Sequence, residues 1–126
     1  MEQTLTKAAA DLAAGRTTPA RQRLRGLVAS FPERLDLREH LADTYCRAGD
    51  AAQAGRWSYL SADRDEREVA AFERIYRDPF ARMKALAWRT SEDSAGPLAA
   101  TRLRALREQA EQIAGAPVCW QHPHRP

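Results

Sequence analysis

The sequence contains little that would support secretion or a membrane span. Two of its 126 residues are cysteines, and they stand apart, Cys46 in a predicted helix and Cys119 in a proline-rich stretch near the C-terminus. Such a pair does not provide the disulfide framework of a small secreted domain. No apolar run reaches the roughly 18 residues of a membrane helix, and the N-terminus lacks the basic flank and apolar core of a signal peptide. We therefore expect a cytoplasmic protein that does not contact a membrane.

Catalytic motifs are missing as well. The sequence has no glycine-rich phosphate loop, no nucleophile elbow, no H-E-x-x-H and no Cys–His pair fixed by spacing. Its carboxylates are plentiful, but they follow positions expected to face solvent. We expect a protein that is not an enzyme and that needs no cofactor.

Lysine occurs only at Lys7 and Lys84, so the net charge of +3 comes almost entirely from arginine. Acidic residues are interleaved with the arginines, which is typical of a solvated surface rather than of a nucleic-acid patch. The alternative is a nucleic-acid-associated regulator that uses two arginine-rich helix faces, formed by Arg21, Arg23 and Arg25 and by Arg102, Arg104 and Arg107.

Strand signals are also sparse. Alanine dominates, and no segment alternates apolar and polar residues for long enough to indicate a strand. The length suits one domain with a core of its own. We predict an all-α protein of about seven helices in a single domain over residues 1–117, followed by an extended or mobile tail over residues 118–126.

Residues 35–60 predict the central helical hairpin. Leu37, Leu41 and Tyr45 form an apolar stripe at helical spacing, Gly49 interrupts it, and a second apolar stripe follows. Two helices joined by so short a turn pack against each other.

A similar hairpin is predicted before it. Residues 3–14 carry an apolar face that ends at Gly15, and Thr18 and Pro19 suit the N-cap and first turn of the next helix. Gly26 stands inside that helix, where glycine is less favourable than alanine by about 1 kcal/mol. We therefore expect another helix to approach closely at Gly26.

The two hairpins repeat. Gly15 and Gly49 are 34 positions apart, and alanines recur at the same distance: Ala8 with Ala42, Ala14 with Ala48, and Ala20 with Ala54. This period, with small residues and a turn glycine at matching places, resembles the tetratricopeptide repeat over residues 1–66. The sequence departs from the repeat pattern at Leu27, Arg38 and Ser58, where a small, an apolar and an aromatic residue are usual.

A second resemblance covers residues 19–60. The segments Ala-Arg-Gln-Arg-Leu-Arg-Gly-Leu-Val and Ala-Gly-Arg-Trp-Ser-Tyr-Leu resemble a family of small uncharacterised bacterial proteins, mainly actinobacterial. That family has no assigned activity. The resemblance therefore implies a helical, cytoplasmic protein and nothing about its chemistry.

After residue 60 the repeat is lost. Asp65 and Glu68 are spaced as a capping box, and Asp78 before Pro79 is a second helix-start signal. We expect a divergent hairpin whose inward side chains are Val69, Phe72, Ile75, Tyr76, Phe80, Met83 and Leu86. A polar loop then precedes a capping helix over residues 97–114, with inward residues Leu98, Leu103, Leu106, Ala110 and Ile113.

The tetratricopeptide resemblance implies a concave groove lined by the first helix of each hairpin. By position, its residues are Leu5, Ala9, Leu12, Ala13, Asp36, Glu39, Asp43, Cys46 and Arg47. The lysines and asparagines with which the family clamps a peptide carboxylate are absent, and a half-apolar, half-acidic groove suits an amphipathic or basic segment of a partner protein or peptide. Two alternatives remain open: these residues form a solvated face, or the last helix fills the groove. We expect a monomer or homodimer.

Two clusters contain metal-ligating residue types. Asp36, His40, Asp43 and Cys46 share one predicted helix, but no second cluster supplies further ligands. Cys119, His122 and His124 form a C-x-x-H-x-H string that is equally consistent with a tail whose Trp120 packs on the body. We predict no metal site and leave the role of the string open.

Three aromatic residues stand near arginines. Trp57, Tyr59 and Trp88 could stack on nucleic-acid bases beside Arg56, Arg64 and Arg89. Their helical spacing beside apolar residues instead predicts that they belong to the core.

Overall fold

A computed structural model of the protein describes residues 1–124. The elements follow in the order α1 (Glu2–Ala13), α2 (Thr17–Ser30), α3 (Leu35–Arg47), α4 (Ala51–Ser58), α5 (Glu66–Ile75), α6 (Pro79–Leu86), the 3-10 helix η1 (Glu92–Ala95) and α7 (Pro97–Ala114). The prediction of an all-α fold with seven helices is confirmed for this part of the chain. The last two residues of the predicted tail, Arg125 and Pro126, lie outside the described residues.

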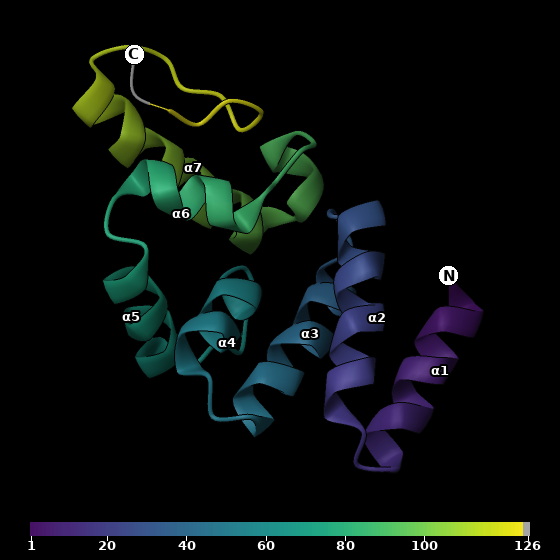
Figure 1. The fold of residues 1–126 in the computed structure, drawn as a ribbon. Helices are drawn as coiled ribbons and strands as arrows, with labels where there is room; N and C mark the ends of the chain where they lie inside the picture. Colours follow the sequence, from purple (N-terminus) through teal and green to yellow (C-terminus); the bar gives the residue numbers. More distant parts are fainter. Residues whose placement is uncertain (125–126) are drawn as a thin grey trace.

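The first four helices are arranged as two successive helix-turn-helix pairs, in which each helix contacts the next (Figure 1). Gly15 and Gly49 lie at the two turns, and both have a φ of 77°. This left-handed conformation suits glycine because it has no Cβ atom. The two turn positions predicted from the sequence are therefore confirmed.

The start of α2 differs from the prediction. The helix begins at Thr17 with Arg16 as its N-cap, so Thr18 does not cap it. The backbone N–H of Arg16 donates to the carbonyl of Asp11 at 2.7 Å, and the Arg16 side chain donates to the carboxylate of the same residue at 3.1 Å. Asp11 thus stabilises the turn, and α2 begins without a side-chain cap.

The close approach between helices occurs at Gly55, and the expectation that it would occur at Gly26 is wrong. A Cβ atom at Gly26 would meet nothing within 4 Å, and the residue is exposed. A Cβ atom at Gly55 would lie 2.1 Å from the carbonyl oxygen of Glu68. Glycine at position 55 thus permits α4 and α5 to pack backbone against backbone.

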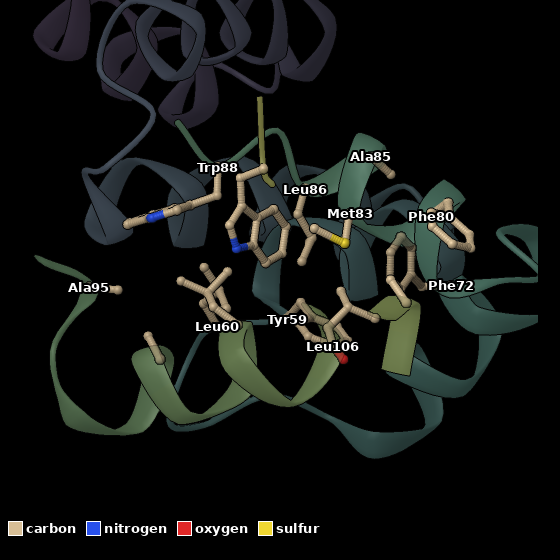
Figure 2. Close-up of a cluster of buried hydrophobic side chains, with 14 of the residues drawn as sticks. Tyr59, Leu60, Phe72, Phe80, Met83, Ala85, Leu86, Trp88, Ala95 and Leu106 are labelled. Carbon is tan, nitrogen blue, oxygen red and sulfur yellow. The ribbon is translucent and has the colours of Figure 1, made fainter. Parts of the chain in front are cut away.

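The buried side chains form two clusters. The first lies within α1–α4 and contains Ala8, Leu24, Leu27, Val28, Leu37, Leu41, Ala42, Tyr45, Ala54 and Trp57. The second extends from the end of α4 to the C-terminal segment, and Figure 2 shows Phe72, Phe80 and Met83 at one end of it and Leu60 and Trp88 at the other. Trp57, Tyr59 and Trp88 are all buried, which confirms that these aromatic residues belong to the core.

Three residues predicted to point inward are exposed. Ile75 is 65% exposed because it is the last residue of α5, and Tyr76 packs against Phe72 instead, with ring centroids 5.0 Å apart. Leu98 and Ile113 are 46% and 49% exposed, near the two ends of α7. The buried stripe of α7 is shifted from the predicted one, with Ala99 and Ala100 in place of Leu98 and Ile113, and consists of Ala99, Ala100, Leu103, Leu106 and Ala110.

Two predicted helix starts in the second half are correct. The carboxylate of Asp65 accepts a hydrogen bond from the Arg67 backbone at the start of α5. Asp78 caps α6 by accepting from the Ala81 backbone, and Pro79 occupies the first turn. Within residues 1–124, no helix is both long and apolar enough to cross a membrane.

The segment after α7 packs against the body. Val118 and Trp120 are buried, and the indole Nε1 of Trp120 donates to Glu92 at 2.8 Å. Arg107 donates to the same carboxylate at 2.6 and 3.1 Å. Glu92 therefore fixes the C-terminal segment to both η1 and α7.

Candidate functional site

A hollow of about 260 Å³ borders the predicted groove helix α3. Its wall is formed by α3, the end of α4, the connection from α4 to α5, and the first turn of α5. We call it the acidic hollow, and its residues are Glu39, Ala42, Asp43, Cys46, Ser58, Ser61, Asp63 and Glu68. Four carboxylates thus surround one concave surface, which predisposes it to cationic groups.

The predicted groove residues fall into three groups. Glu39, Asp43 and Cys46 line the acidic hollow, and the structure brings them together with Asp63 and Glu68, which were not predicted as groove residues. Asp36 and Arg47 lie on α3 outside the hollow. The α1 residues of the prediction, Leu5, Ala9, Leu12 and Ala13, are not part of its wall. Ala9 and Ala13 are exposed, and Leu5 and Leu12 are half-buried.

The carboxylates of the acidic hollow are only partly neutralised. Asp43 pairs with Arg47 at 2.8 Å, and Glu39 accepts a hydrogen bond from the Ser61 hydroxyl at 2.8 Å. Within residues 1–124, no basic side chain forms an ion pair with Glu39, Asp63 or Glu68. The hollow therefore retains negative charge that a basic ligand can neutralise.

Cys46 at the hollow is not an activated thiol. A hydrogen bond with Glu68 and the negative charge of that carboxylate raise the pKa of the Cys46 thiol above its usual range. Since the thiolate is the nucleophilic and metal-binding form, this environment disfavours both roles. No group of three or more His, Cys, Asp or Glu side chains between residues 1 and 124 is placed to hold a metal ion.

Helix α7 does not occupy the acidic hollow. No residue of α7 belongs to its wall, and the principal contacts of α7 are with η1 and α6. Figure 1 shows α7 beside α6, away from α1 and α2.

Arg38 on α3 is a further candidate, which the sequence marked only as a departure from the repeat pattern. It is 2% exposed, and its guanidinium donates to the carbonyls of Pro32 and Leu86, each at 2.7 Å. Its Cζ atom lies 5.6 Å from the ring centroid of Trp57 and 5.4 Å from that of Trp88, so two aromatic faces accompany the buried charge. The available signal was an arginine in an apolar position of a repeat, between Leu37 and Leu41.

Arg56 has a similar role on α4. Its Nε donates to the carbonyl of Ala85 at 2.8 Å, and its guanidinium lies 4.4 Å from the Trp57 ring centroid. Both arginines thus satisfy carbonyls at the C-terminus of α6, where positive charge is favourable. The chain leaves that helix through Ala87, which adopts a left-handed φ of 52°.

Most arginines of the two faces considered for nucleic-acid binding are engaged within the protein. Arg21 donates to Thr44 and stacks on Tyr45, and Arg23 pairs with Asp11 at 2.9 Å. In α7, Arg102 donates to the carbonyl of Ser61, and Arg107 is held by Glu92 and Glu111. These contacts do not favour the nucleic-acid alternative, which stays a prediction.

Comparison with known proteins gives a family but no characterised relative. The model of a family of unknown function, DUF6584, matches residues 1–126. No curated protein and no solved structure matches the chain.

Proposed function

Because the chain belongs to the DUF6584 family, whose function is unknown, we propose a function from its own geometry: it is a non-catalytic protein-interaction module that holds a basic segment of a partner protein against the acidic hollow. This proposal includes the sequence-based expectation of a cytoplasmic protein that acts by reversible binding.

The first part of the proposal concerns the scaffold. We propose that α1–α4 form two tetratricopeptide-like hairpins, because their turn glycines are 34 positions apart and share a φ of 77°. In repeat arrays of this kind, neighbouring helices present a continuous concave surface to a ligand. In this protein, helix α3, which carries Glu39 and Asp43, is the proposed centre of such a surface.

The observation that carries the proposal is the excess of negative charge at the acidic hollow. Glu39, Asp63 and Glu68 have no basic partner within residues 1–124, although the chain as a whole has a net charge of +3. Charge complementarity mainly determines which partners associate and how fast. A lysine- or arginine-bearing segment is therefore the proposed ligand.

The proposed contact surface continues along the groove predicted from the sequence. Asp36 and Arg47 extend it on α3, and Leu5, Ala9 and Leu12 extend it on α1. Arg47, which is paired with Asp43, would exchange that ion pair for contacts with the partner.

Charge reversal tests the proposal. We expect the double variant Glu39→Lys/Asp43→Lys to abolish capture of the partner and to bind a lysine-rich helical peptide at least about tenfold more weakly than the natural chain. Fluorescence anisotropy with the labelled peptide measures the binding, and far-UV circular dichroism checks that the helical content is unchanged. Both residues are exposed, so we expect the melting temperature to remain nearly the same.

A matched control separates local from overall charge. The double variant Asp93→Lys/Glu108→Lys makes the same change of net charge at exposed positions of η1 and α7, away from the hollow and from the proposed surface on α1, and we expect it to retain peptide binding. Equal weakening in the two double variants, or unaltered binding in the first, would exclude the acidic hollow as the binding surface. Photo-cross-linking in cells from a reactive residue at position 43 then identifies the partner.

A further inference from the structure

A pocket of about 160 Å³ lies between α2, α3, α4 and the residues that follow α6. We call it the arginine pocket, because Arg25, Arg38, Arg56 and Arg89 all line it and no carboxylate does. The remaining lining residues are apolar and include Trp57. Four arginines from four different segments therefore line one small space.

The positive charge of this pocket has no counter-ion. Within residues 1–124, none of the four arginines forms an ion pair with a carboxylate. Burial and, to a smaller extent, the positive charge of Arg56 lower the pKa of Arg38 to about 10. The folded protein thus holds a guanidinium in an environment that disfavours its charge, and a bound anion would reverse that effect.

Two residues that line the pocket each carry a buried donor without a partner. Nη2 of Arg38 and Nε1 of Trp57 have no hydrogen-bond acceptor within the described part of the chain. Arg38 is also one of the most completely buried large side chains of the protein. A buried donor without an acceptor is unfavourable, so an acceptor group bound beside Arg38 and Trp57 would be stabilised by donors that the fold leaves unused.

We propose that the arginine pocket binds a phosphate group, either free phosphate or the phosphate of a small monoester. A phosphate dianion offers several acceptor oxygens to the planar forks of neighbouring guanidiniums, and it neutralises two charges where a carboxylate neutralises one. Arg25 and Arg89 are the exposed arginines of the pocket, and Arg38 is the buried one, whose guanidinium is already held in place by the carbonyls of Pro32 and Leu86. The apolar part of the wall accommodates the substituent of a monoester.

This site is separate from the acidic hollow. The two share no lining residue, and the charges that surround them have opposite signs. Failure of phosphate binding would therefore leave the proposed interaction module intact, and the reverse also holds.

Calorimetric titration of the full chain tests the proposal with three probes at constant ionic strength: inorganic phosphate, phenyl phosphate and acetate. We expect saturable binding of both phosphates and none of acetate. Tighter binding of phenyl phosphate indicates a monoester as the ligand, and equal binding indicates free phosphate, and both support the site. Bound phosphate should also raise the melting temperature in a concentration-dependent way.

The matched variants avoid Arg38, whose loss would disturb the fold. Arg25→Gln/Arg89→Gln changes two exposed residues of the pocket, and we expect about tenfold weaker phosphate binding or more, because two charge-assisted contacts are lost. Arg74→Gln/Arg77→Gln makes the same change of net charge at exposed positions outside the pocket and should bind like the natural chain. The single variants Arg25→Gln and Arg89→Gln show how much each residue contributes to phosphate affinity. Acetate binding as strong as that of phosphate, no saturable binding, or equal affinity in both double variants overturns the proposal.

Discussion

The guanidinium of Arg38 and the carbonyl oxygen of Leu86 lie 2.7 Å apart, although 48 positions separate them in the chain. Arg38 extends from α3, whose buried apolar side chains belong to the first hydrophobic cluster, and Leu86 belongs to the second. The other contacts of Arg38, to the carbonyl of Pro32 and the rings of Trp57 and Trp88, involve both clusters as well. One charged side chain thus connects the two halves of the protein.

We expect Arg38→Ala to lower the free energy of unfolding by about 3 kcal/mol or more. The substitution leaves the carbonyls of Pro32 and Leu86 without this donor and opens a cavity between two tryptophan rings. Arg38→Lys should also destabilise, because one ammonium group cannot reproduce the fork that reaches both carbonyls. Urea denaturation followed by far-UV circular dichroism measures both effects.

The control for Arg38 is Arg77→Ala, at an exposed position between α5 and α6. We expect it to change the free energy of unfolding by no more than about 0.5 kcal/mol. If Arg38→Ala were as mild as Arg77→Ala, the connection between the clusters would contribute no stability.

Two glycines inside helices should respond to alanine in opposite directions. Gly55→Ala places a methyl group 2.1 Å from the carbonyl oxygen of Glu68, so α4 and α5 must separate, and we expect a loss of about 2 kcal/mol or more. Gly26→Ala meets nothing within 4 Å in α2, and we expect a gain of about 0.5–1 kcal/mol from helix propensity. Parallel thermal melts of the two variants measure the difference. A stabilising Gly55→Ala would show that the contact between α4 and α5 is not as tight as described.

Local chemistry explains which parts of the fold were predictable. Gly15 and Gly49 turn the chain because of their own φ angles, and Asp65 and Asp78 cap helices through backbone groups two or three residues away. Such signals are complete within a few residues, so the sequence reveals them.

Contacts between distant segments explain what was missed. Gly55 is close to Glu68, which belongs to the next helix, and Arg38 reaches Leu86, so neither partner is visible in a local pattern. The candidate site shows the same difference between local signals and contacts of distant segments. Glu39 and Asp43 could be predicted from their places on one helix, whereas Asp63 and Glu68 join them only through the path of the chain after α4.

The contact of the C-terminal segment with the body should depend on pH through Glu92. Burial raises the pKa of this carboxyl, but hydrogen bonds from Arg107 and Trp120 and the positive charges of Arg107 and Arg104 outweigh it, so the pKa lies below its ordinary value of 4.5. A carboxylate whose pKa is lower in the folded than in the unfolded state stabilises the fold fully above the unfolded pKa. That stability is lost as the pH falls through the folded pKa.

We therefore expect Glu92→Gln to be less stable than the natural chain at neutral pH, and the difference to shrink as the pH falls below about 4.5. Urea denaturation at a series of pH values measures it. Asp93→Asn is the matched control, because the Asp93 side chain is 90% exposed and lies 3.7 Å from Arg104; at neutral pH we expect it to change stability by no more than about 0.5 kcal/mol. If the loss of stability in Glu92→Gln were the same from neutral to acidic pH, it would come from the different shape and hydrogen bonding of the amide. The charge of Glu92 would then not be what holds Trp120 and Arg107 together.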